Sequence, residues 1–219
     1  MKFNEAVGIN EEIKSLNGKK GIIVFDIDDT LLTADSSTIK IYKTVNGGPE
    51  VGLNTSQFAS DPDKGKPGVK YDYREFRDPE KVYSSIVNGT PILNNLKIMD
   101  AHIRANYDFC FLTARGLQDV VDKALRKFLL TKDKNGKLVG LGDAFKDGLS
   151  SAINDDFKVY PGASDSEKKA NVLRKLCNEY DVVRFVDDDA RNIQAARELG
   201  LPNLKVIQAH KAGENNGKR

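Results

Sequence analysis

The hydrophobic pattern divides the chain into short apolar runs separated by amphipathic segments. Residues 21–25 form a continuous apolar run, Gly-Ile-Ile-Val-Phe, which is typical of a strand buried on both faces. Further runs of strand length occupy residues 107–112, 157–160, 182–186 and 204–208. Since strands that alternate with helices form parallel sheets, the pattern predicts an α/β fold. We expect a Rossmann-like three-layer sandwich with a central parallel sheet.

Apolar residues at helical spacing predict the helices of this fold. They are expected at residues 3–17, 79–87, 91–105, 117–130, 165–179 and 189–199. Ser164 and Glu167 have the spacing of a capping box before the fifth helix, and Asp189 is a candidate N-cap for the last one. These capping residues fix where two of the helices should begin.

One part of the chain has a different composition. Residues 34–78 are rich in glycine and proline, and residues 38–45 alternate before the turn signal Asn46-Gly47-Gly48, which predicts a hairpin. We therefore interpret residues 34–90 as a small β-rich cap insertion. Residues 1–33 and 91–210 would form the core domain, and residues 211–219 a flexible tail.

Composition narrows the class of protein. The 34 basic and 32 acidic residues give a net charge of +2, which does not indicate a general nucleic-acid binder. No apolar run approaches the roughly 18 residues of a membrane span, and the polar N-terminus does not look like a signal peptide. Cys110 and Cys177 are scattered, so a reducing compartment is the default. A cytoplasmic location is the expectation, and the oligomeric state stays open.

Polar clusters directly follow three of the predicted strands. They are Asp26-Ile27-Asp28, Thr113-Ala114-Arg115 and Asp187-Asp188-Asp189. Because ligands of open parallel sheets bind beyond the carboxyl ends of the strands, we expect these clusters to form one site. Several carboxylates without histidine or cysteine favour a hard cation such as Mg²⁺, and a carboxylate can also attack phosphorus.

The same clusters resemble the motifs of the haloacid dehalogenase (HAD) superfamily. Residues 26–31, Asp-Ile-Asp-Asp-Thr-Leu, look like its first motif, and residues 111–115, Phe-Leu-Thr-Ala-Arg, look like its second. Lys168 or Lys169 resembles the third, and residues 185–193 resemble the fourth in its paired-acid form. The four motifs occur in family order between residues 20 and 208. The resemblance implies a HAD-like core and a Mg²⁺-dependent phosphatase that passes through an aspartyl-phosphate.

The resemblance also implies a role for each acidic residue. Asp26 would be the nucleophile and a metal ligand. Asp28 would be the general acid and base, and its backbone carbonyl would bind Mg²⁺. Asp188 would be a direct metal ligand, and Asp187 a ligand or its support. Asn192 stands where many family members carry another aspartate, which leaves the geometry around Asp187 open.

Basic and hydroxyl residues would complete the site. The resemblance implies that Thr113 binds the phosphoryl oxygens, and that Ala114, Arg115 and Lys168 contact the substrate. The resemblance favours Lys169 over Lys168 as the catalytic lysine, because the spacing from Lys169 to Leu173 matches the family's spacing better. From the residues alone, Arg115 fits substrate contact and surface charge equally well, and each lysine taken singly is typical of a solvated helix face.

The small size of the insertion at residues 34–90 indicates which substrates can reach the site. A hairpin with loops leaves the site open, which suits a large substrate such as a nucleic-acid end, and a nucleotide or another phosphorylated small molecule fits as well. The layout is similar to the phosphatase half of polynucleotide kinase-phosphatases, and no kinase P-loop motif is present. Two alternatives remain: a phospho-accepting signalling domain, and a non-catalytic HAD-fold binding module.

Overall fold

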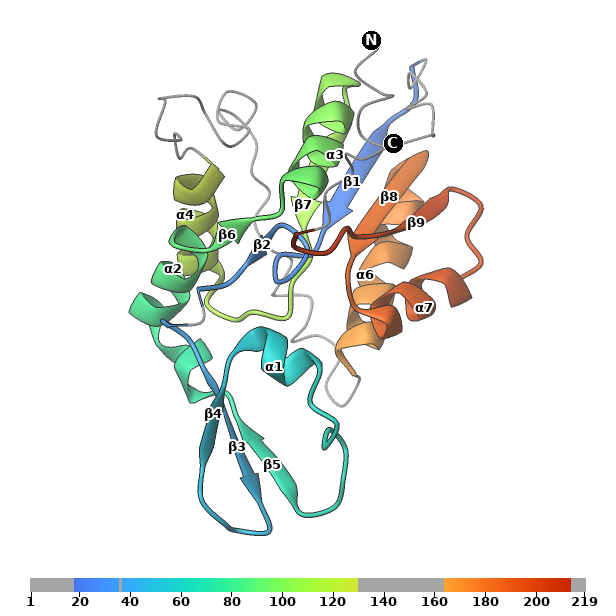
Figure 1. Ribbon diagram of the computed structural model, residues 1–219. Helices are drawn as coiled ribbons and strands as arrows, with labels where there is room; N and C mark the ends of the chain where they lie inside the picture. The colour runs from blue at the N-terminus through green and yellow to red at the C-terminus, as the bar shows by residue number, and fades with distance from the viewer. Residues whose placement is uncertain (1–17, 36, 130–163, 214–219) are drawn as a thin grey trace.

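The computed structural model describes residues 18–35, 37–129 and 164–213 (Figure 1). The predicted helix at residues 3–17 and the predicted strand at 157–160 lie outside the described residues, as does most of the predicted tail. Among the helices that are described, none combines the length and apolar character needed to cross a bilayer.

A four-stranded parallel sheet forms the centre of the molecule. Its strands, in spatial order, are β7 (Asp108–Phe111), β1 (Gly21–Phe25), β8 (Val182–Asp187) and β9 (Leu204–Gln208). The predicted α/β fold with a central parallel sheet is thereby confirmed. In the register, Phe25 pairs with Phe111 on one side and with Val186 on the other. The polar residues that follow these three strands therefore leave the sheet at the same edge.

Helices cover both faces of this sheet (Figure 1). They are α3 (Leu93–Arg104), α4 (Gln118–Leu129), α6 (Asp165–Glu179) and α7 (Ala190–Glu198). The ends of all four lie within two residues of the prediction. Ile23 and Phe25 pack into an apolar cluster with α3 and α4, whereas Ile22 and Val24 pack into a second cluster with α6 and α7. Alternate residues of a strand point to opposite faces, so the all-apolar β1 run follows from burial on both sides.

The segment between β1 and α3 forms a second, smaller sheet. Its antiparallel strands lie in the order β4 (Val51–Leu53), β3 (Ile41–Val45) and β5 (Val69–Asp72). The predicted hairpin is confirmed, and its turn places Asn46 and Gly47 at positive φ, as this turn chemistry requires. A short helix α1 (Thr55–Ala59) and a 3-10 helix η2 (Arg74–Arg77) complete the layer. In Figure 1 this sheet lies at the bottom, on the side to which β1 points.

Two contacts join this segment to the core. The strands β2 (Leu32–Thr33) and β6 (Thr90–Pro91) pair antiparallel, so the chain enters and leaves the segment at one point. Helix α2 (Pro79–Val87) packs along α4, and its residues Val82 and Ile86 belong to the same apolar cluster as Phe25. The Asp78 carboxylate accepts from the N–H groups of Glu80 and Lys81 and so caps α2. The small sheet is thus held to the core through α2.

Candidate active site

Three carboxylates from two strand ends converge at the edge of the sheet. Asp26 follows β1, and its N–H donates to the carbonyl of Val186 at 3.0 Å. Asp26, Asp187 and Asp188 each offer a carboxylate oxygen, and these oxygens all lie within 4.8 Å of one another. The structure therefore brings together three of the four residues that were predicted to bind metal.

Lys169 lies inside this cluster. Its Nζ is 2.8 Å from Asp26 Oδ1 and 2.7 Å from Asp187 Oδ2, and all three side chains are buried. Helix α6 positions it: the predicted Ser164 capping box starts the helix, and Lys169 shares its buried face with Val172 and Leu173. The neighbouring Lys168 turns to Asp165 at 3.8 Å. Lys169 therefore contacts the predicted nucleophile Asp26 directly.

Asp187 is fixed by donors on both oxygens. It is fully buried, and besides Lys169 it accepts from the Asp189 N–H at 2.9 Å. The Asn192 amide donates to Oδ1 and Oδ2 at 3.1 and 3.0 Å, while its own Oδ1 accepts from Ser166 Oγ at 2.8 Å. Asn192 thus links α7 to α6 and holds Asp187, which settles the geometry that the sequence left open. Asp189 caps α7 as predicted, with its carboxylate on the Arg191 N–H.

Asp188 has a different environment. It is only half-buried, and its Oδ1 accepts from Thr30 Oγ1 at 3.2 Å. Thr30 belongs to the first motif, and the sequence predicted no role for it. The fold places its hydroxyl against the acidic cluster. Because the oxygens of Asp187 are already occupied by donors, Asp26 and Asp188 carry the oxygens best placed for a cation.

Asp28 is paired with Arg115. The guanidinium donates from Nε to Oδ2 at 2.7 Å and from Nη2 to Oδ1 at 2.6 Å, which is the bidentate geometry of a strong ion pair. Arg115 is 3% exposed, so its interpretation as a surface charge is wrong. In the part of the chain that the structure describes, the Asp28 carboxylate is not a member of the metal-capable group. Its predicted contribution to the metal is through the backbone carbonyl.

Two residues of the insertion hold Arg115 in place. Ser85, on α2, accepts from Arg115 Nη1 at 2.9 Å, and the guanidinium lies 5.5 Å from the centre of the Phe76 ring. Neither contact was predicted, because Ser85 and Phe76 carry no local signal that distinguishes them from ordinary packing residues. The contacts depend on α2 packing against α4.

The second-motif residues line the same edge. Thr113 is buried, and its Oγ1 accepts from the Arg115 N–H at 3.2 Å. Ala114, between them, is exposed. Thr113 and Ala114 therefore lie on the chain between the end of β7 at Phe111 and Arg115, which pairs with Asp28.

The electrostatics show an excess of negative charge. Burial raises the pKa of Asp26 well above its ordinary value; Lys169 opposes the shift, and Asp187 adds to it. Burial, together with the charge of Asp187, raises the pKa of Asp188 to about 7. Burial lowers the pKa of Lys169, but Asp26 and Asp187 outweigh it, so that pKa is raised. Three crowded carboxylates around one ammonium fit a divalent cation with oxygen ligands, and Mg²⁺ suits this donor set.

Asp188→Asn is expected to stabilise the protein without metal. The folded pKa of Asp188, about 7, lies above the ordinary 3.8, so its contribution is full below that ordinary value and is lost as pH rises through 7. Asparagine avoids this loss. In thermal melts with EDTA, the variant should melt higher than wild type at about pH 8, by a smaller margin at about pH 5, and equally at about pH 3. Mg²⁺ should raise the melting temperature of wild type and not that of the variant.

The neighbouring residue provides the control. The Asp189 carboxylate caps α7, and its hydrogen bond with Arg191 lowers its pKa, so the linkage has the opposite sign. Asp189→Asn should therefore not stabilise the protein at about pH 8, and it should keep the response to Mg²⁺. A Mg²⁺ response that survives in Asp188→Asn would contradict the assignment of Asp188 as a ligand.

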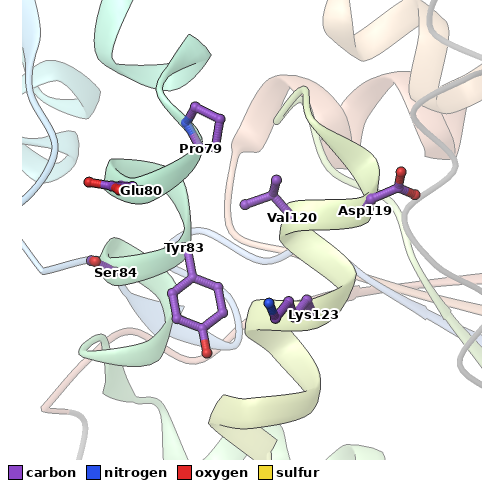
Figure 2. Close-up of a pocket in the computed structure, with 7 residues that line it drawn as sticks. All are labelled: Pro79, Glu80, Tyr83, Ser84, Asp119, Val120 and Lys123. Carbon is purple, nitrogen blue, oxygen red and sulfur yellow. The ribbon is translucent and has the colours of Figure 1, made fainter.

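A separate surface groove lies between α2 and α4. Figure 2 shows Tyr83 and Lys123 facing each other across it, and the Lys123 ammonium is 5.8 Å from the centre of the Tyr83 ring. Its other lining residues are Pro79, Glu80, Ser84, Asp119 and Val120. It contains none of the predicted site residues, so the chemistry is assigned to the acidic cluster.

Comparisons with known proteins give one structural likeness. No protein-family model matches the chain, and no curated protein matches it. Among solved structures, the fold is similar to that of a HAD family enzyme from Bacteroides thetaiotaomicron, solved as a magnesium complex. The two chains are 13% identical, the match covers 90% of this chain and 96% of the other, and the TM-score is 0.44. A likeness at this level assigns no function, which must come from the site itself.

Proposed function

We propose that this chain is a Mg²⁺-dependent phosphatase of the HAD type, which hydrolyses a phosphate monoester through an aspartyl-phosphate on Asp26. One observation carries the proposal: a single buried ammonium, that of Lys169, joins Asp26 to Asp187 beside a third carboxylate, Asp188. This arrangement presents a positioned carboxylate nucleophile next to a donor set for a hard cation. The four sequence motifs in family order support the same function.

The proposed metal site uses residues already in place. Asp26 and Asp188 would hold Mg²⁺ through their carboxylates, and Asp28 would hold it through its backbone carbonyl. Asp187 would keep the neighbouring groups in place through its hydrogen bonds. When bound, Mg²⁺ supplies positive charge that offsets these carboxylates and the phosphate of the substrate. The raised pKa values of Asp26 and Asp188 support this, because burial and the neighbouring carboxylates disfavour their ionised forms, which a cation would stabilise.

The residues of the chain then divide the chemistry. Lys169 fixes the Asp26 carboxylate through Oδ1, and Oδ2 attacks the phosphorus as the ester P–O bond breaks. Thr113 donates a hydrogen bond to a phosphoryl oxygen. Asp28, once one of its oxygens has left Arg115 and taken up a proton from solvent, gives that proton to the leaving alkoxide, and it then accepts a proton from the water that attacks the aspartyl-phosphate. The products are an alcohol and inorganic phosphate, and Asp26 is regenerated.

Arg115 is a positioning residue in this scheme. Its bidentate contact fixes the carboxylate of Asp28, which follows the nucleophile by two residues in the sequence. Ser85 and Phe76 in turn hold Arg115. Proton transfer at Asp28 requires one of the two guanidinium contacts to open. This assigns Arg115 to the general acid, a role different from the substrate contact that the sequence implied.

Turnover of p-nitrophenyl phosphate tests the proposal. The full chain should release nitrophenol over many turnovers with Mg²⁺ and none with excess EDTA. A phospho-accepting signalling domain would instead give one slow phosphorylation per chain and no multiple turnover. A chain that fails to hydrolyse p-nitrophenyl phosphate, nucleotides and phosphorylated oligonucleotides with Mg²⁺ would be a binding module.

A further inference from the structure

The insertion contains a row of three aromatic side chains, one end of which lies beside Arg115. The row consists of Phe58, Tyr73 and Phe76. The Phe58 and Tyr73 ring centres are 5.7 Å apart at 89°, and those of Tyr73 and Phe76 are 6.3 Å apart at 72°. Both are edge-to-face contacts, so the ring of Tyr73 is fixed from two sides.

Phe76, at one end of this aromatic row, and Tyr73, in its middle, lie near different parts of the candidate site. At one end, Phe76 lies 5.5 Å from the guanidinium of Arg115, which holds Asp28. Around Tyr73, burial raises the pKa of the phenol, the charge of Asp165 raises it further, and that of Arg191 lowers it. Asp165 begins α6, which carries Lys169, and Arg191 lies in the first turn of α7 beside Asn192. Phe76 therefore lies beside the residue that holds the general acid, and charges at the starts of α6 and α7 act on Tyr73.

Tyr73 is the member of the row that a ligand can reach. It is 41% exposed, whereas Phe58 and Phe76 are half-buried. An exposed aromatic ring that is held rigid by its neighbours suits stacking against a planar group, because little side-chain freedom is lost on binding.

Basic groups surround the same part of the row. The Lys64 ammonium lies 3.9 Å from the centre of the Phe58 ring, and the charge of Arg191 lowers the pKa of Lys64 after the larger effect of burial. The Arg191 side chain is 71% exposed while it pairs with Asp189. A cation against this aromatic row, together with the exposed ring of Tyr73, favours a planar ligand that carries negative charge.

We propose that Tyr73, held by Phe58 and Phe76 and flanked by Lys64 and Arg191, binds the leaving group of the substrate, and that this group is a nucleoside. The base stacks on the Tyr73 ring, and in an oligonucleotide the two cations face the phosphodiester next to this nucleoside. The assignment rests on the proposed phosphatase function, and it makes Tyr73 a specificity residue. A free nucleotide and the phosphorylated end of an oligonucleotide share the stacked base.

Binding to an inert variant tests the assignment without turnover. In the Asp26→Asn background, calorimetric titration with a nucleoside monophosphate and Mg²⁺ should give a dissociation constant about tenfold higher when Tyr73→Ala is added. Tyr73→Phe should keep the wild-type affinity because the ring remains. The matched control is Val51→Ala, an exposed position on β4 of the same small sheet that should change nothing.

Kinetics separate recognition from folding. With Asp26 intact, Tyr73→Ala should lower kcat/KM about tenfold for a nucleoside monophosphate and leave it unchanged for glycerol phosphate, which has no ring. Equal losses on both substrates, or an unchanged dissociation constant in the titration, would overturn the assignment. If the wild-type chain hydrolyses neither substrate, the proposed phosphatase function is wrong. The proposal for Tyr73 is then decided by the titration, which measures whether Tyr73 binds nucleotide.

The two sources of nucleotide differ in salt dependence. On a 3′-phosphorylated oligonucleotide, Lys64→Ala should reduce the slope of log kcat/KM against log salt by about 0.7 if the strand runs over Lys64. The control Lys66→Ala removes a lysine of the same loop that pairs with Asp63 at 2.8 Å, and it should leave the slope unchanged. A reduced slope assigns the oligonucleotide end. If wild type and Lys64→Ala have the same slope, and kcat/KM is higher for the mononucleotide, the substrate is the free nucleotide.

Discussion

Replacing Asp26 by asparagine is expected to reduce turnover of p-nitrophenyl phosphate by at least about 10³-fold, to background. An amide cannot attack phosphorus, and the neighbouring carboxylates of Asp187 and Asp28 cannot replace it. Asp187 has both oxygens occupied by Lys169, Asn192 and a backbone N–H, and Asp28 is held by Arg115. The loss should appear in kcat, because the substitution removes the covalent step and leaves the substrate contacts in place.

The variant should fold at least as well as wild type. Burial raises the pKa of Asp26, so the carboxylate costs stability at neutral pH, and asparagine keeps an oxygen for Lys169. The matched control is Asp29→Asn in the same loop. Asp29 has φ of 55°, a conformation that asparagine tolerates well, so this variant should stay within about twofold of wild-type activity. Residual turnover by Asp26→Asn near the level of Asp29→Asn would rule out Asp26 as the nucleophile.

The architecture could be predicted because its signals are local. The apolar run of β1 is buried on both faces, and a capping box at Ser164 starts α6 where the spacing placed it. The Asn46-Gly47 turn fixes the hairpin. Each of these features depends on a few neighbouring residues. For the same reason the ends of α2 and α6 agree with the prediction residue for residue.

The acidic cluster could be predicted because parallel strands end at one edge. Asp26 and Asp187 belong to adjacent strands, so their convergence follows from topology. The partner of Arg115 could not be predicted in this way. Arg115 and Asp28 are 87 residues apart, and Ser85 reaches Arg115 only because α2 packs on α4. Contacts set by the docking of an insertion leave no periodic trace in the sequence.

Lys169→Met is expected to destabilise the protein by about 3–5 kcal/mol at neutral pH, besides abolishing turnover. The ammonium is buried between Asp26 and Asp187, at 2.8 and 2.7 Å, and methionine would leave two carboxylates facing each other without a counter-charge. Urea denaturation with EDTA would measure the loss. The folded pKa of Asp26 is raised already and would rise further without Lys169, so protonation relieves the repulsion. The loss should therefore be largest at about pH 8 and smaller at about pH 5.

The adjacent lysine makes this prediction specific to one helix position. Lys168 pairs with Asp165 at 3.8 Å, and an ion pair at the surface contributes only about 0–1 kcal/mol. Lys168→Met should therefore change the free energy of unfolding by less than about 1 kcal/mol, with no difference between the two pH values. One residue along an α-helix rotates a side chain by about 100°, which carries it from the acidic cluster to the surface. Equal losses in the two variants would mean that Lys169 carries no special charge interaction, and Asp26 would then lack the partner that positions it for attack.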